Sequence, residues 1–141
     1  MTRVDFHSQV QDKIHYSCRL IRKARTANCQ ILVLSEDEQQ AQALDLALWN
    51  FSASDFLPHV MLENPLAAQT PIIITTALPA ALPHHDLLIN LSQHLPDNFQ
   101  QFNRVIEVIS QQEQDAASGR QRFRLYQQQG VKPSHLVAST S

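Results

Sequence analysis

A strand-then-helix pattern that occurs twice before residue 51 constrains the fold of this chain more than any other feature. In its second copy, the segment Gln30–Leu34 is apolar without alternation, which is typical of a strand covered on both faces. Ser35 and Glu38 follow at the spacing of a capping box, so we predict a helix that starts here and continues to about Phe51. Two strands that each lead directly into a helix predict an α/β layered domain.

The first copy of the pattern opens the chain. Arg3–His7 alternates between polar and apolar residues, which predicts a strand, and Ser8 is the expected N-cap of a helix over about Gln9–Thr26. Apolar positions recur every three or four residues in this helix and include Cys18, which we expect to be an inert buried thiol. The two cysteines form no C-x-x-C pair, so a disulfide framework or zinc site is not expected and a reduced, cytoplasmic setting fits.

The rest of the chain predicts four more strands and one long helix. The strands cover residues 60–62, 72–75, 87–91 and 104–109, with a helical turn at about 97–102. The helix covers about Gln111–Gln129 and ends at Gly130, because glycine is the usual residue just past a helix end. We expect one three-layer αβα domain over residues 1–133, followed by a mobile tail over residues 134–141.

Glycine occurs only at Gly119 and Gly130, and this scarcity excludes the common phosphate-binding loops. The seven histidines have no metal-ligand spacing, and no serine lies in a G-x-S-x-G elbow. We therefore expect no catalytic activity of its own, no cofactor and no metal. The longest strongly apolar segment, Pro71–Leu82, is too short to cross a membrane.

The net charge of −2 argues against broad binding to nucleic acid through phosphate contacts. One basic cluster lies in the second half of the first helix, at Arg19, Arg22, Lys23 and Arg25. It is interpreted as surface charge that complements the helix dipole, with direct DNA binding as the alternative.

The last predicted helix carries the main candidate binding site. Arg120, Phe123 and Arg124 are spaced i, i+3 and i+4, so they share one face of the helix. Two guanidinium groups beside an aromatic ring suit a ligand that combines a carboxylate with an apolar or aromatic group. The alternative is that Phe123 belongs to the core and that the arginines only decorate the helix.

A second candidate surface surrounds Trp49. This tryptophan ends the second helix, next to a loop that contains Phe56, Pro58 and His59. Tryptophan at such a position is a common anchor at protein interfaces, and packing into the core is the alternative.

Four short motifs occur in a fixed order along nearly the whole chain. They are Leu44-Asp45-x-Ala47-Leu48-Trp49, Phe56-x-Pro58-His59, Asp86-x-Leu88-Ile89-x-Leu91 and Arg120-x-Arg122-Phe123-Arg124-x-Tyr126-x-x-x-Gly130. Together they resemble the chi subunit family of bacterial DNA polymerase III holoenzyme. The spacing from D-x-A-L-W to F-x-P-H is the most specific part of the resemblance.

The resemblance implies a Rossmann-like αβα fold with a mostly parallel sheet, and an accessory subunit of the clamp-loader assembly without enzymatic activity. It implies a link to single-stranded-DNA-binding protein through the acidic C-terminal tail of that protein, which ends in phenylalanine, so that DNA is reached only indirectly. Matched by position, Arg120 and Arg124 would hold the carboxylates of the tail, and Phe123 with Ile109 would line the apolar pocket.

The resemblance also implies a second partner. Trp49 and Phe56 match positions at which the family binds its psi subunit, which tethers chi to the clamp loader. The alternative function that the sequence leaves open is a nucleotide- or small-ligand-binding enzyme on the same fold. Its site would lie near residues 35–38, at the carboxyl ends of the strands.

Overall fold

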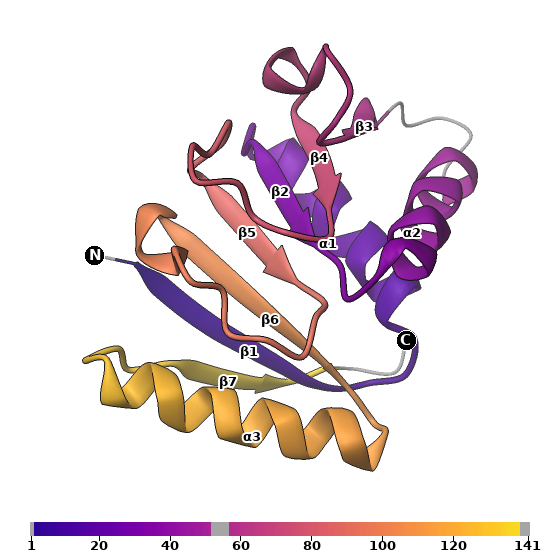
Figure 1. Cartoon of the computed structure of the whole chain (residues 1–141). Coiled ribbons are helices and arrows are strands. Elements are labelled where there is room, and N and C mark those ends of the chain that lie inside the picture. Colours follow the sequence, from indigo (N-terminus) through magenta and orange to yellow (C-terminus); the bar gives the residue numbers. More distant parts are fainter. Residues whose placement is uncertain (1, 52–56, 139–141) are drawn as a thin grey trace.

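A twisted parallel sheet runs through the computed structural model, which describes residues 2–51 and 57–138 (Figure 1). Its strands are β1 (Arg3–Val10), β2 (Ile31–Leu34), β3 (His59–Met61), β4 (Ile72–Thr75), β5 (Leu87–Asn90), β6 (Arg104–Ser110) and β7 (Ser134–Val137). Within the described residues these seven strands lie in the order β3-β4-β2-β5-β6-β1-β7. Every neighbouring pair is parallel, which confirms the predicted α/β class and parallel sheet.

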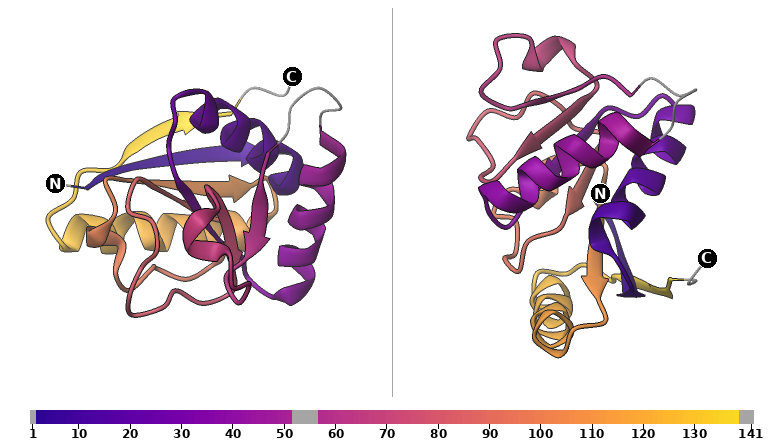
Figure 2. Two further views of the ribbon diagram at one scale, coloured as in Figure 1. Left: turned by 90° about the horizontal axis from the view of Figure 1, so that it is seen from above. Right: turned by 90° about the vertical axis from the view of Figure 1, so that its right-hand side faces the viewer.

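Helices cover both faces of the sheet (Figure 2). The helices α1 (Lys13–Thr26) and α2 (Glu38–Phe51) lie on one face, and α3 (Glu113–Gln128) lies on the other. Beside α3, the second face is covered by loops, since Leu82, Phe99 and Phe102 pack in the same cluster as Tyr126 of α3. Two short 3-10 helices, η1 (Ala67–Gln69) and η2 (Phe99–Gln101), lie in these connections. The predicted three-layer, Rossmann-like arrangement is confirmed.

The central strands are buried on both faces, as their uninterrupted apolar sequences predicted. Every residue of β2, β4 and β5 is buried, as expected for parallel strands that are covered on both faces. Successive side chains point to opposite faces, so Ile31 and Val33 pack under α1 and α2 while Leu32 and Leu34 pack on the α3 side. Of the helices in the described part of the chain, none has the length and apolar composition needed to cross a bilayer.

The start of α1 differs from the prediction. β1 continues through Ser8 and Gln9 to Val10, and the N-cap is Asp12, whose carboxylate accepts two backbone N–H groups of the first turn. Gln9 has a φ of 61°, and the register between β1 and β6 shifts between His7 and Val10. This β-bulge lengthens the strand and moves the N-cap four residues along the chain, from the predicted Ser8 to Asp12, so Ser8 as N-cap was wrong.

The predicted capping box at the start of α2 was also wrong. Asp37 Oδ1 accepts the N–H of Gln40 at 2.8 Å, and Gln40 Oε1 accepts the N–H of Glu36 at 2.7 Å. Ser35 is buried instead, and its hydroxyl has no hydrogen-bond partner among the described residues. The cap therefore uses a pair with the same three-residue spacing, located two positions later in the chain.

The end of α3 agrees with the prediction. Gly130 has a φ of 86°, in the left-handed region that glycine tolerates, and its N–H donates to the carbonyl of Gln127 at 3.1 Å. The Val131 N–H donates to the carbonyl of Tyr126, also at 3.1 Å. These two bonds form a Schellman motif with Gly130 at C′.

The segment after this motif contains β7, where we expected a mobile tail. β7 pairs in parallel with β1, and the Ser134 hydroxyl donates to the carboxylate of Asp5. All four side chains of β7 are exposed, so the strand is held by backbone hydrogen bonds rather than by burial. This is why no apolar pattern marks it, and the sheet extends beyond the predicted domain end at residue 133. Residues 139–141 lie outside the described residues.

Candidate functional site

The four residues that were predicted to form a site line one pocket of about 540 Å³. Arg120, Phe123 and Arg124 come from α3, and Ile109 comes from the end of β6. The helix spacing correctly placed the three α3 residues on one face, and Ile109, which only the family resemblance implied, lines the same pocket.

Phe123 packs against the core and also lines the pocket. Its side chain is half-buried and packs against Phe6 of β1, with ring centres 5.1 Å apart, and it also lines the pocket. The pocket floor beneath α3 depends on Gly119. A Cβ at position 119 would lie 2.8 Å from Cδ1 of Ile109, so the glycine lets the helix lie directly on this side chain.

The two arginines of the pocket are exposed. Arg120 Nη2 lies 3.1 Å from Glu113 Oε1, and both side chains are mostly in solvent. An exposed pair of this kind contributes little to stability, so the guanidinium is available to another carboxylate. Arg124 makes no hydrogen bond or ion pair with another described residue. The arrangement presents two cations at the rim of a partly apolar pocket.

Sequence reasoning missed the part of the wall that β1 and β7 supply. Ser8, Gln9 and His135 line the same pocket, and His135 Nε2 lies 2.5 Å from the Ser8 hydroxyl. Gln9 holds the left-handed φ of the bulge, a conformation that is uncommon for a residue with a side chain and often found near functional sites. No local signal marks these residues, because the pairing of β7 with β1 joins the two ends of the chain.

A buried polar cluster fixes the rotation of α3. Glu107 of β6 is fully buried and accepts hydrogen bonds from Arg122 Nε at 3.1 Å, Tyr126 Oη at 2.7 Å and Asn90 Nδ2 at 2.9 Å. Burial raises the pKa of Glu107, although Arg122, Asn90 and Tyr126 act in the opposite direction. Because Arg122 turns inward to this carboxylate, the arginines two positions before and after it turn outward.

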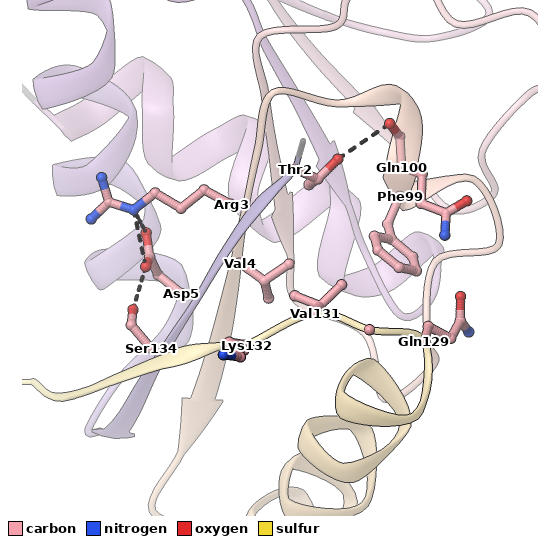
Figure 3. A pocket seen from close by; sticks show the side chains of 11 residues that line it. Thr2, Arg3, Val4, Asp5, Phe99, Gln100, Gln129, Val131, Lys132 and Ser134 are labelled. Carbon is pink, nitrogen blue, oxygen red and sulfur yellow. Dashed lines mark hydrogen bonds and ion pairs between the residues drawn. The ribbon is translucent and has the colours of Figure 1, made fainter.

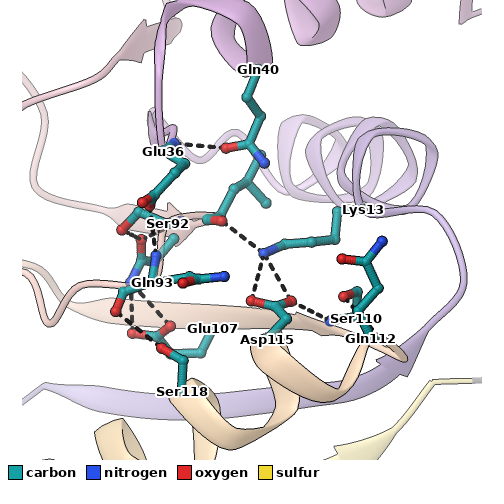
Figure 4. Close-up of polar contacts among 12 residues, drawn as sticks. Lys13, Glu36, Gln40, Ser92, Gln93, Glu107, Ser110, Gln112, Asp115 and Ser118 are labelled. Carbon is teal, nitrogen blue, oxygen red and sulfur yellow. Dashed lines mark hydrogen bonds and ion pairs between the residues drawn. The ribbon is translucent and has the colours of Figure 1, made fainter.

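A second buried contact fixes the start of α3 (Figure 4). Lys13 Nζ lies 3.1 Å from Asp115 Oδ2 and donates to the carbonyl of Leu91 at 2.7 Å, while Asp115 also accepts the N–H of Ser110. Burial alone would raise the pKa of Asp115, but the Ser110 N–H and Lys13 outweigh it and hold this pKa below its ordinary value. The helix that carries the pocket is therefore anchored to β6 and to α1.

The second candidate surface also has the expected exposure. Trp49 is 59% exposed and lies beside the exposed Leu46 on α2, so packing of Trp49 into the core is excluded. Its ring lies on His59, with ring centres 4.8 Å apart, and His59 Nε2 is 3.2 Å from Asp45 Oδ1. This contact joins the D-x-A-L-W and F-x-P-H motifs in space. Phe56 lies outside the described residues.

The crevice at the carboxyl ends of β2, β4 and β5 is the place where the alternative function would need its ligand. It has a volume of about 620 Å³, and its lining includes Glu36 and Asp97. Of the described residues that line it, none is lysine or arginine. The negative charge of Glu36 and Asp97 is therefore not balanced by a cation in this lining, which is unfavourable for binding a nucleotide phosphate.

A larger hollow of about 760 Å³ lies at the amino end of β1, beside the turn after α3 (Figure 3). Val4, Phe99 and Val131 form apolar parts of its wall, and Asp5 at its edge pairs with Arg3. Burial would raise the pKa of Asp5, but hydrogen bonds from Ser134 and Arg104 outweigh it, so this pKa is lowered. The Asp5 carboxylate is thus engaged with the protein itself.

Several other cysteine, histidine and arginine residues are buried or make contacts within the protein itself. Burial of Cys18 was predicted correctly and raises the pKa of its thiol to about 11. His84 is buried, and its Nε2 lies 2.6 Å from the carbonyl of Thr70. In the basic cluster of α1, the Arg22 guanidinium lies over the ring of Phe51 and Arg25 donates to the carbonyl of Cys29. Within residues 2–51 and 57–138, no group of three or more His, Cys, Asp or Glu side chains could hold a metal ion.

Comparison with known proteins gives consistent matches over most of the chain. The family model described as "DNA polymerase III chi subunit, HolC" matches residues 1–134. The DNA polymerase III subunit chi of Pseudomonas aeruginosa is 34% identical over 134 residues, which cover 92% of each chain. The corresponding subunit of Escherichia coli K12 is 26% identical over 129 residues, covering 92% of this chain and 86% of the relative.

Proposed function

The chain belongs to the DNA polymerase III chi subunit family, and on that premise we propose that it is a non-catalytic accessory subunit of the clamp-loader assembly in the cytoplasm. In this role it links the assembly to single-stranded-DNA-binding protein by binding the acidic C-terminal tail of that protein. The subunit contacts DNA only through that partner.

The observation that carries this proposal is the pocket formed by Ile109, Arg120, Phe123 and Arg124. A tail that ends in phenylalanine offers an aromatic ring and a terminal carboxylate, with aspartate carboxylates just before them. The half-buried Phe123 and the buried Ile109 suit the ring, and the two exposed guanidinium groups suit the carboxylates. The positive rim is local, because the whole chain has a net charge of −2.

We assign the Trp49 surface to a different partner, the psi subunit. The exposed side chains of Trp49 and Leu46 form an apolar patch on α2. We include Phe56 in the psi-binding surface because of its place in the F-x-P-H motif. This patch lies on the face of the sheet opposite α3, so both partners can bind at the same time.

Calorimetric titration with a peptide tests the tail site. The probe is an acidic peptide that ends in phenylalanine with a free carboxylate. We expect a dissociation constant in the micromolar range, which corresponds to a binding free energy of about 7–8 kcal/mol. Arg124→Ala should weaken binding about 10-fold, since it removes one charge-assisted contact of about 1.4 kcal/mol. Binding should also weaken as salt is added.

Two variants serve as controls for this titration. Arg22→Ala removes the same charge from α1, on the other face of the sheet, and Trp49→Ala removes the exposed ring. Both should bind the peptide as the unmodified protein does. Equal weakening by Arg22→Ala and Arg124→Ala would reduce the interaction to general charge attraction and would contradict the proposed site.

A further inference from the structure

Among the described residues, β7 is the last strand in the sheet order and has no strand on its outer side, which is called the open edge below. The Ala138 N–H donates to the Ser8 carbonyl of β1 at 2.9 Å. Backbone groups of successive residues in a strand alternate between its two sides, so Ser134 and Leu136 also face β1. His135 and Val137 therefore direct their backbone N–H and C=O groups to the open edge.

Within the short strand β7 no residue is Asp, Glu, Lys, Arg or proline, while Lys132 and Pro133 stand just before it. Edge strands of soluble proteins are commonly protected by charged side chains, by proline or by a bulge. The four residues of β7 are Ser, His, Leu and Val, and the side chains of Leu136 and Val137 are 54% and 59% exposed. The backbone groups of His135 and Val137 are thus available to pair with a short extended segment.

Positive charge flanks β7 on both faces of the sheet. On the α3 face, His135 shares the pocket with Arg120 and Arg124. On the α1 face, a hollow of about 310 Å³ is lined by Lys23 and Arg19 together with residues 136–138. No described residue that lines this second hollow is acidic. On the α3 face Glu113 offsets part of the charge of Arg120, so Arg124 supplies most of the positive charge there.

We propose that the open edge of β7 binds an extended acidic peptide segment as an eighth strand of the sheet, continuous with the ligand in the pocket. Alternate side chains of an added strand point to opposite faces, so its carboxylates reach the cations on both sides of β7. The inference rests on the proposed function, because the segment is the stretch of the bound tail that precedes its last residues. The pocket then holds the end of the tail, and β7 extends the contact by main-chain hydrogen bonds.

Two peptides separate the edge from the pocket. The short one is Asp-Asp-Ala-Phe with a free carboxylate, and the long one adds Asp-Thr-Asp-Thr-Asp-Thr before it. We expect the long peptide to bind about 3- to 10-fold more tightly than the short one. The gain is modest because main-chain hydrogen bonds and exposed ion pairs each replace contacts with water and add little net free energy.

Val137→Pro tests the main-chain contact without changing any charge. Proline removes the N–H that faces the open edge and leaves the N–H groups that face β1 in place. The variant should bind both peptides with nearly equal affinity, while the control Val137→Ala retains the preference for the long peptide. Circular dichroism and unchanged binding of the short peptide check that the fold is intact.

A second measurement uses the unmodified protein. The long peptide is methylated on alternate backbone nitrogens of its added segment, in the two possible registers. One register should reduce its affinity to that of the short peptide, since it blocks the N–H groups that face β7.

Each outcome has a distinct meaning. If the short peptide binds but the long one binds no more tightly, or if Val137→Pro and methylation leave the preference unchanged, the β7 inference is overturned and the pocket stands. If neither peptide binds, the proposed function fails as well. If sedimentation shows a dimer that Val137→Pro dissociates, a second copy of the chain occupies the edge, and the peptide proposal is wrong.

Discussion

Arg122 and Arg124 lie two residues apart on α3, and the fold uses them in opposite ways. Arg122 is 2% exposed and pairs with the fully buried Glu107, whereas Arg124 is exposed and has no partner among the described residues. Removing a buried charged partner leaves the other charge uncompensated in the core, which is costly. An exposed arginine contributes almost nothing to folding and is available for a ligand.

This difference shows that the buried face of α3 fixes the orientation of its exposed face. The inward cluster of Glu107, Arg122 and Tyr126 sets the rotation of the helix, and the Lys13–Asp115 pair sets the position of its start. The outward arginines then project from a fixed platform, which lowers the entropy lost when a ligand binds. Stability and binding should therefore respond to different residues of the same helix.

The largest expected effect is the difference in stability between alanine variants of the two arginines. Arg122→Ala should lower the free energy of unfolding by about 3–5 kcal/mol, because Glu107 is left buried without its cation. Arg124→Ala should change it by less than about 0.5 kcal/mol. Denaturant titration of both variants measures the difference, and equal effects would show that α3 is not held by its inward face.

A smaller effect should appear in the acid dependence of stability. The pKa of Asp115 is lowered in the folded protein, so its ionised form stabilises the fold above the ordinary value of 3.8, and this stabilisation is lost as the pH falls through the folded pKa. At pH 7, Asp115→Asn should cost about 1–2 kcal/mol, since Lys13 loses its partner. The gap between the variant and the unmodified protein should narrow below about pH 4 in thermal unfolding experiments. A constant gap would show that the ion pair contributes nothing.

The smallest effect tests the outward face alone. Glu113 pairs with Arg120 at the rim of the pocket and repels an incoming carboxylate. Glu113→Gln should therefore strengthen binding of the acidic peptide about 2- to 3-fold, within the range measured for exposed ion pairs, and should leave stability nearly unchanged. Weaker binding by this variant would mean that Glu113 positions Arg120 for the ligand instead of competing with it.

The sequence predicted those elements whose cause is local. The apolar runs in β2, β4 and β5 reflect burial on both faces, and the spacing of Arg120, Phe123 and Arg124 reflects the helix period. Gly130 ends α3 because its left-handed φ is a property of that one position. Each of these features can be recognised within a window of a few residues.

What the sequence did not predict depends on contacts between distant segments. The burial of Arg122 requires Glu107 on a neighbouring strand, and the wall formed by Gln9 and His135 requires the two ends of the chain to meet. The bulge at Gln9 turned a predicted helix start into strand, and polar Ser8 gave the wrong cap. Sequence patterns describe which face of an element is buried, but not which partner covers it.

The position of β1 in the sheet has a consequence for the order of events during synthesis. Both strands that pair with β1 lie in the last third of the chain, with Arg3 opposite Arg104 and Phe6 opposite His135. β1 must therefore remain unpaired until β6 has been synthesised about 100 residues later, and contacts of such long range are slow to form. A growing chain that still lacks β6, α3 and β7 cannot assemble the pocket, so it cannot compete for the ligand.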